Sequence, residues 1–162
     1  MTAAERMARM LALAVPAALL GGAYVSQYGF GLYPCEMCLW QRWPHFAALG
    51  LAFLALFIRP GRWLIGLAAA SIAISGLIGG FHAGVEYGWW EGLTGCATIP
   101  LAGEGASALD AVMNAPMIRC DRAPWDLLGV SLAGWNFLIS AAAALAIAVL
   151  LTNDRGTHDA QK

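Results

Sequence analysis

Charged residues in this chain are gathered into short segments, and the stretches between them are long and apolar. Residues 10–35, 43–58, 63–85 and 127–153 contain no Asp, Glu, Lys or Arg. A helix needs roughly 20 mostly apolar residues to cross about 30 Å of hydrocarbon. The pattern therefore predicts four membrane-spanning helices, at about residues 10–28, 39–58, 63–82 and 131–151.

The composition supports a membrane protein and excludes several other classes. Hydrophobic residues make up 60% of the 162 residues and charged residues only 12%, whereas soluble domains are about 25% charged. Nine basic against ten acidic residues leave no basic excess for binding nucleic acid. Because lipid offers the backbone no hydrogen-bond partner and four segments cannot close a barrel, we predict an all-α integral membrane protein. Residues 1–162 are expected to form a single domain, a four-transmembrane-helix bundle.

Lysine and arginine are unevenly distributed between the two sides of these spans. Six lie on the side that holds both termini, namely Arg6, Arg9, Arg59, Arg62, Arg155 and Lys162. Three lie on the other side, namely Arg42, Arg119 and Arg122. Because basic loops stay in the cytoplasm, we predict cytoplasmic termini and outer loops at about residues 29–38 and 83–130. A cleavable signal peptide at the basic, then apolar, N-terminus is the alternative.

The longer outer loop contains a further candidate element. Leu109, Val112 and Met113 follow the i, i+3, i+4 spacing of one helix face. This spacing predicts a short amphipathic helix that lies on the membrane surface.

Four cysteines lie in the two predicted outer loops. Cys35 and Cys38 form a Cys-Glu-Met-Cys motif where the first outer loop meets the second span, and Cys96 and Cys120 lie in the longer loop. The predicted topology places all four on the oxidising side of the membrane, where disulfides persist. A Cys-x-x-Cys pair at a helix start is expected to be reactive, because the helix N–H groups favour the thiolate.

Two charged residues modify this thiol pair. Arg42 follows Cys38 by four residues, one turn further along the same helix face. Its guanidinium can stabilise a Cys38 thiolate or a negative oxygen on a bound ligand; the alternative is an arginine that extends to the membrane interface. Glu36, between the cysteines, is expected to oppose Arg42 and to raise the pKa of the thiols.

The four outer cysteines are also compatible with roles other than a reactive thiol pair. They could form two structural disulfides. A four-cysteine zinc site is disfavoured because Cys96 and Cys120 lack the spacing of a second C-x₂₋₄-C pair. Covalent haem attachment needs a histidine after the motif, where this chain has Leu39. We predict no metal site.

Two segments resemble a known family. Residues 33–42 (YPCEMCLWQR) are similar to the first outer loop of the disulfide bond formation protein B (DsbB) family. Residues 120–129 (CDRAPWDLLG) resemble that family's last cysteine and the Trp-Asp-hydrophobic-Leu-Gly stretch after it. Four predicted helices, internal termini and two outer cysteine pairs extend the resemblance over nearly the whole chain.

The resemblance implies a quinone-dependent thiol oxidase of the bacterial inner membrane. Such a protein reoxidises a periplasmic DsbA-like oxidase with a thioredoxin fold and passes two electrons to ubiquinone or menaquinone. By this resemblance, the partner's thiolate attacks Cys96, Cys120 resolves onto the first loop, and Cys35 receives that exchange. Cys38 faces the quinone, and Arg42 holds a quinone oxygen.

Two histidines are further candidates. His82 and Glu86 are four residues apart at the outer end of the third span. One interpretation is an interfacial histidine with a hydrogen-bonded carboxylate. The other is a quinone-site residue, His82, that donates a proton to reduced quinone. His45, one turn beyond Arg42, is a candidate on position alone. Four glycines of the third span are predicted to be helix-packing contacts, namely Gly66, Gly76, Gly79 and Gly80.

Two alternative functions come from other classes. One is a thiol enzyme similar to the quinone-epoxide reductases, in which the Cys-x-x-Cys lies in the last span and not in the second. The other is a non-enzymatic membrane scaffold with two structural disulfides. Treatment with mild thiol reagents distinguishes the scaffold from an enzyme, since structural disulfides resist reduction.

Overall fold

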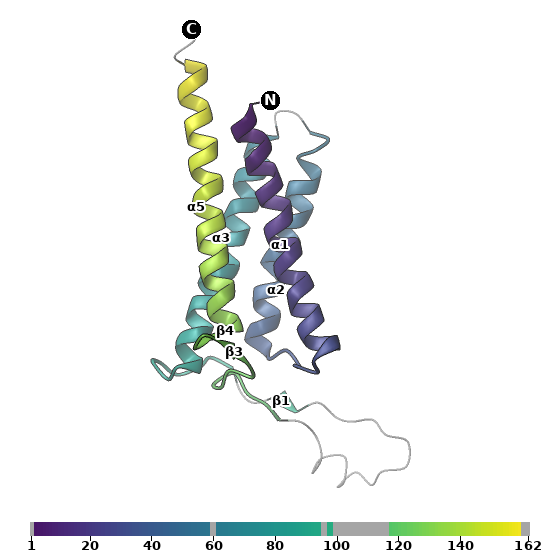
Figure 1. Ribbon diagram of the computed structural model, residues 1–162, viewed down its shortest axis with the longest axis vertical. Helices are drawn as coiled ribbons and strands as arrows, with labels where there is room; N and C mark the ends of the chain where they lie inside the picture. The colour runs from purple at the N-terminus through teal and green to yellow at the C-terminus, as the bar shows by residue number, and fades with distance from the viewer. Residues whose placement is uncertain (1, 59–60, 95–96, 99–116, 160–162) are drawn as a thin grey trace.

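The computed structural model describes residues 2–58, 61–94, 97–98 and 117–159. Four long helices run alongside one another, namely α1 (Ala3–Gly29), α2 (Glu36–Leu54), α3 (Arg62–Glu86) and α5 (Leu132–Asp159). They form an elongated bundle, with the start of α1 and the end of α5 at the same end (Figure 1). The described short strands lie at the opposite end. The length of the bundle therefore separates the end that holds the predicted outer loops from the end that holds the chain termini.

Three of the four helices are long and apolar enough to cross a membrane. These are α1, α3 and residues Leu132–Asn153 of α5, which match three of the predicted spans. The described helices do not confirm a fourth span at 39–58. Helix α2 packs within the bundle, but the mean hydropathy of its most apolar stretch is lower than in the other three helices. The reason is its polar first half, which contains Gln41, Arg42 and His45.

Two short β-ladders were not predicted from the sequence. Strand β1 (Ala97–Thr98) pairs antiparallel with β2 (Met117–Ile118), and β3 (Asp126–Leu127) pairs with β4 (Val130–Ser131). The turn between β3 and β4 has two positive φ angles, +57° at Leu128 and +76° at Gly129. Such a pair is typical of a two-residue type I′ hairpin turn. The predicted surface helix at Leu109, Val112 and Met113 lies outside the described residues.

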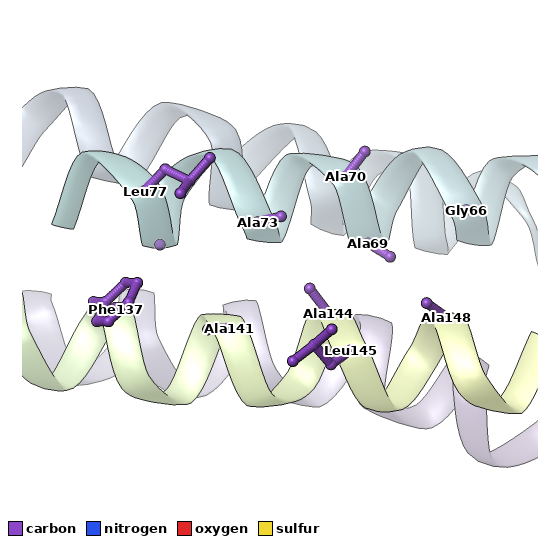
Figure 2. Close-up of a pocket in the computed structure, with 11 residues that line it drawn as sticks. Gly66, Ala69, Ala70, Ala73, Leu77, Phe137, Ala141, Ala144, Leu145 and Ala148 are labelled. Atoms are coloured by element: carbon purple, nitrogen blue, oxygen red, sulfur yellow. The ribbon is translucent and has the colours of Figure 1, made fainter. Parts of the chain in front are cut away.

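Small side chains let α3 pack closely against both α2 and α5. The buried core of the bundle is mostly alanine, with Leu64, Ile65, Ile72 and Ile147 as its larger members. An apolar groove of about 480 Å³ follows the α3–α5 contact. Figure 2 shows alanines of both helices between its walls, with Leu77 and Phe137 towards one end. Large apolar side chains such as Trp43 and Phe57 are exposed, as expected for a surface that faces lipid.

Three of the four predicted glycine contacts are confirmed. A Cβ atom on Gly76 would lie 2.9 Å from the Ser140 Cβ, and one on Gly80 would lie 3.0 Å from the Phe137 ring. At Gly79 it would lie 2.9 Å from both the Ala133 carbonyl oxygen and the Asn136 amide. The prediction for Gly66 is wrong, because nothing lies within 4 Å of its Cβ position.

Replacing Gly79 with alanine is expected to destabilise the bundle. The new methyl group would meet backbone and a buried amide, neither of which can move freely, and such overpacking costs about 1–3 kcal/mol. Thermal unfolding in detergent measures the change. Gly66→Ala is the matched control on the same helix and is expected to leave the melting temperature unchanged. Equal effects of the two substitutions would contradict this account.

Candidate active site

The Cys-x-x-Cys motif forms the first turn of α2. Cys35 is the N-cap of the helix, and its Sγ accepts a hydrogen bond from the Cys38 backbone N–H at 3.2 Å. The two Sγ atoms lie 2.8 Å apart. Cys35 is buried, whereas Cys38 is partly exposed. The helix start therefore holds two sulfurs next to each other with unequal access.

A third cysteine reaches this pair from the loop between α3 and α5. Cys120 is buried and packs in one cluster with Cys35, Met37 and Val85. Its Sγ accepts a hydrogen bond from the Thr94 hydroxyl at 3.1 Å. The structure thus brings together three of the four predicted cysteines. Cys96, predicted to be the sulfur that the partner attacks, lies outside the described residues.

The two sulfurs of the motif differ in acidity. Both precede the second predicted span, which begins at Leu39. The hydrogen bond from the Cys35 thiol lowers the pKa of Cys38, with a smaller contribution from the Arg42 guanidinium, while burial opposes this effect. The same hydrogen bond, together with burial, raises the pKa of Cys35. Glu36 is exposed. The opposite directions of the two pKa shifts favour Cys38 over Cys35 as the thiolate.

Alkylation of the reduced protein is expected to show this difference. Only the thiolate reacts with iodoacetamide, so Cys38 stays reactive as the pH falls until its lowered pKa is passed. Cys35 becomes reactive only above the usual thiol pKa. We expect the two pH–rate midpoints to differ by more than about one pH unit, measured by mass spectrometry of each site. Cys35→Ala, which removes the thiol donor, should raise the Cys38 midpoint; coincident midpoints in the unmodified protein would contradict the assignment.

His82 and Glu86 lie beside the thiol pair, and both side chains are only 2% exposed. The His82 Nε2 atom is 3.6 Å from Cys35 Sγ and 3.7 Å from Glu86 Oε1. The ring also lies within hydrogen-bond reach of the Cys120 backbone. The other carboxylate oxygen, Glu86 Oε2, is buried without a hydrogen-bond partner among the described residues. His82 therefore contacts the redox sulfurs as well as the predicted carboxylate.

Arg42 faces α1. Its Nη1 donates to Gln27 Oε1 at 2.7 Å and its Nη2 donates to the Ala23 carbonyl at 3.4 Å. The guanidinium carbon lies 4.9 Å from the centre of the Tyr24 ring. A guanidinium has five N–H donors, so these two bonds fix its position and leave donors for a ligand.

A cavity of about 240 Å³ opens next to these groups, between α1, α2, the end of α3 and the start of α5. Its polar lining includes Cys38, Gln41, Arg42, His45, His82 and Glu86. Most of the remaining lining is apolar, from residues such as Leu20 and Leu132. The volume is below the range of about 300–1,000 Å³ for drug-sized ligands. The cavity therefore suits one ring-sized headgroup beside the Cys38 sulfur.

Sequence reasoning missed a buried network of polar side chains, part of which lines the cavity. Asn136 Nδ2 donates to Gln41 Oε1 at 2.8 Å and to the Ser75 carbonyl at 3.2 Å. Asn136 Oδ1 accepts from Ser140 Oγ and lies 2.9 Å from His45 Nε2. A signal for this network existed, since polar residues inside apolar spans are costly and commonly functional.

The thiol pair and His82 could also contact a metal ion. One ligand atom from each of Cys35, Cys38 and His82 lies within 4.8 Å of the others. Sulfur and imidazole ligands suit zinc and other soft ions. Whether the imidazole can act as a ligand depends on which of its nitrogens carries the proton.

The chain matches the family model described as "Disulfide bond formation protein DsbB" over residues 5–150. A disulfide bond formation protein B of Azoarcus sp. (strain BH72) is 33% identical, covering 96% of this chain and 99% of the relative. One from Verminephrobacter eiseniae is 29% identical, with 98% and 90% covered. An uncharacterized Rickettsia prowazekii protein is 24% identical, with 82% and 79% covered.

No solved structure matches the chain significantly. The family match covers both the bundle and the cysteine motif at the start of α2. The relatives are aligned over most of their own length, so the likeness concerns whole proteins. The chain therefore belongs to the DsbB family of disulfide bond formation proteins.

Proposed function

We propose that this membrane protein reoxidises a periplasmic DsbA-like oxidase with a thioredoxin fold and passes the electrons to a membrane quinone. The observation that carries the proposal is the order of the sulfurs. Cys120 packs against Cys35, Cys35 contacts Cys38, and Cys38 lines the cavity. This order supports a path for electrons from the outer loop to a ligand beside the bundle.

Each thiol–disulfide exchange breaks one disulfide and forms another, and only the final transfer to the quinone removes electrons from the protein. The partner's thiolate attacks Cys96 and releases Cys120 as a thiolate, and Cys120 then attacks Cys35 and releases Cys38. The partner's second thiolate forms the partner disulfide and releases Cys96. Cys96 then attacks Cys120 and releases Cys35, which leaves Cys35 and Cys38 as the reduced pair. The Arg42 guanidinium, whose charge lowers the pKa of Cys38, favours its departure as a thiolate. A bound quinone supplies the two-electron acceptor, and its reduction also takes up two protons.

The residues of the cavity fit a quinone headgroup, either ubiquinone or menaquinone. The apolar lining suits the ring, Arg42 has unused donors for a ring oxygen, and His82 has an N–H group nearby. His82 would help to hold the ring or donate a proton, and Cys38 would lie against it. A lipid-soluble oxidant reaches a thiol only at the membrane boundary, where the first turn of α2 lies if the bundle spans the bilayer.

The proposed location is the bacterial inner membrane, with both termini in the cytoplasm. α2 would be the fourth span, because it lies between α1 and α3 in the same bundle. The Gln41 side chain contacts His82 of α3 and Asn136 of α5, and the His45 ring contacts Asn136, so both are shielded from lipid. The motif at the start of α2 argues against the epoxide-reductase alternative, in which the last span holds it.

The deciding experiment uses the full chain in detergent, mixed anaerobically with a reduced DsbA-like oxidase and a soluble ubiquinone analogue. We expect loss of quinone absorbance with one partner disulfide formed per quinone reduced. Protein that is reduced and then alkylated with N-ethylmaleimide is the control and should be inactive. No quinone loss, with cysteines inert to the partner, would favour a scaffold with structural disulfides.

Replacing Arg42 with lysine is expected to weaken quinone binding. Lysine keeps the charge but loses the planar set of donors that bonds both Gln27 and a ligand. Loss of a hydrogen bond from a charged group costs about 1.5–3 kcal/mol, so KM for the quinone should rise roughly 10- to 100-fold. Steady-state kinetics measure this. An unchanged KM would show that Arg42 does not hold the quinone.

A further inference from the structure

Backbone carbonyls fix the orientation of two buried amides in the polar network. Gln41 Nε2 donates to the Met37 carbonyl at 3.2 Å, and Asn136 Nδ2 donates to the Ser75 carbonyl at 3.2 Å. A carbonyl oxygen only accepts, so both nitrogens are identified. Asn136 Nδ2 also donates to Gln41 Oε1 at 2.8 Å, which fixes Gln41 a second time.

This orientation determines where His82 carries its proton. Gln41 Nε2 lies 2.9 Å from His82 Nδ1. An amide nitrogen cannot accept a hydrogen bond, so Nδ1 must be the accepting, unprotonated nitrogen. In a neutral imidazole the proton is then on Nε2. That nitrogen faces Cys35 Sγ at 3.6 Å and Glu86 Oε1 at 3.7 Å, both of which accept.

We propose that Gln41 is a positioning residue, whose amide keeps the His82 proton on Nε2 and directed at the Cys35 sulfur. When the Cys96 thiolate attacks Cys120 in a Cys35–Cys120 disulfide, the new S–S bond joins Cys96 to Cys120 and the electron pair stays on Cys35. The Nε2–H group faces that developing charge, which favours its release. This part rests on the proposed function, whereas the position of the proton does not.

The same arrangement disfavours metal binding at the thiol pair. A metal ion needs a lone pair on Nε2, and so a proton on Nδ1. That proton would face the Gln41 donor across 2.9 Å. Gln41 therefore disfavours coordination of a soft metal ion by the His82 imidazole, although Cys35, Cys38 and His82 are close enough to bind one ion together. The redox thiols stay available for exchange.

Metal affinity tests this inference without quinone or partner. The reduced full-length protein in detergent is titrated with Cd²⁺, and the thiolate–cadmium absorbance is followed. In Gln41→Glu the carboxylate accepts from Nδ1–H and favours the metal-binding form of His82. Partners of this kind change metal affinity about 10–100-fold, so we expect the Kd for Cd²⁺ to fall by that factor.

A double substitution separates this effect from the added negative charge. Gln41→Glu combined with His82→Phe should lose the gain, because the imidazole ligand is absent. A gain that persists in the double variant, or an unchanged Kd in the single variant, would overturn the inference. Both outcomes leave quinone turnover by the wild type, and so the proposed function, to be judged separately.

The unmodified protein provides a second test that does not depend on folding of any Gln41 variant. Histidine labelled with ¹⁵N distinguishes protonated from unprotonated ring nitrogens. The His82 signals are assigned by their loss in His82→Phe. We expect a protonated Nε2 and an unprotonated Nδ1. The reverse assignment would overturn the inference.

Discussion

Replacing Cys38 with serine is expected to abolish the quinone reduction that we propose for this protein. Cys38 is the sulfur that both carries the lowered pKa and lines the cavity, and a serine hydroxyl is not ionised at neutral pH. Loss of a nucleophile of this kind lowers turnover at least about a thousandfold. The loss should be the same with a reduced DsbA-like protein or with dithiothreitol as the electron donor, measured by quinone absorbance.

A matched variant shows whether the loss is specific to this sulfur. Met37→Leu changes the neighbouring buried residue without changing polarity and should keep most of the turnover. If Cys38→Ser still reduces quinone at a tenth or more of the wild-type rate (roughly 1.4 kcal/mol in the barrier), another group reacts with the quinone.

Replacing Cys120 with serine should separate the two halves of the electron path. Cys120 is the described cysteine of the outer loop that packs against Cys35. Without it, electrons from a protein partner cannot pass to Cys35, and partner-driven turnover should fall at least about a thousandfold. Dithiothreitol can reduce the Cys35–Cys38 bond directly, so quinone reduction with that donor should remain within about threefold of wild type.

The trapped species gives an independent measurement for the same variant. Cys96 is then a free thiol, so the partner is supplied with only its attacking cysteine, activated as a mixed disulfide with thionitrobenzoate. The Cys96 thiolate displaces thionitrobenzoate, and the Cys96–partner disulfide should accumulate on a non-reducing gel. Accumulation in Cys96→Ser instead would show that the entry sulfur is Cys120. Equal loss with both donors would mean that Cys120 supports the fold and not the transfer.

The sequence predicted those parts of the fold that local hydropathy determines. The charge-free runs of α1, α3 and α5 predicted three helices long enough to span a membrane. Hydropathy could not decide whether α2 spans the membrane, because the polar side chains of α2 form hydrogen bonds with other helices and not with water. The β3–β4 hairpin was missed because Leu128, an unusual residue for positive φ, occupies a turn position.

The site was predictable where neighbours in sequence are neighbours in space. The motif placed Cys35 and Cys38 together, and the i, i+4 spacing paired His82 with Glu86. The closer partner of His82, Gln41, is 41 residues away, and Gln41 meets Asn136 across 95 residues. No local periodicity records such contacts. The sequence placed Arg42 on the same helix face as Cys38 but did not predict its hydrogen bond to Gln27, which directs the guanidinium towards α1.

The amide of Asn136 has a consequence for how the chain assembles during synthesis. Gln41 and Ser75 emerge well before Asn136, which comes from the last helix, α5. Until α5 arrives, Gln41 Oε1 lacks the donor that it has in the finished bundle, and an unpaired amide in hydrocarbon is costly. If α2 is the fourth span as proposed, its insertion is expected to stay reversible until the C-terminal helix completes the polar layer.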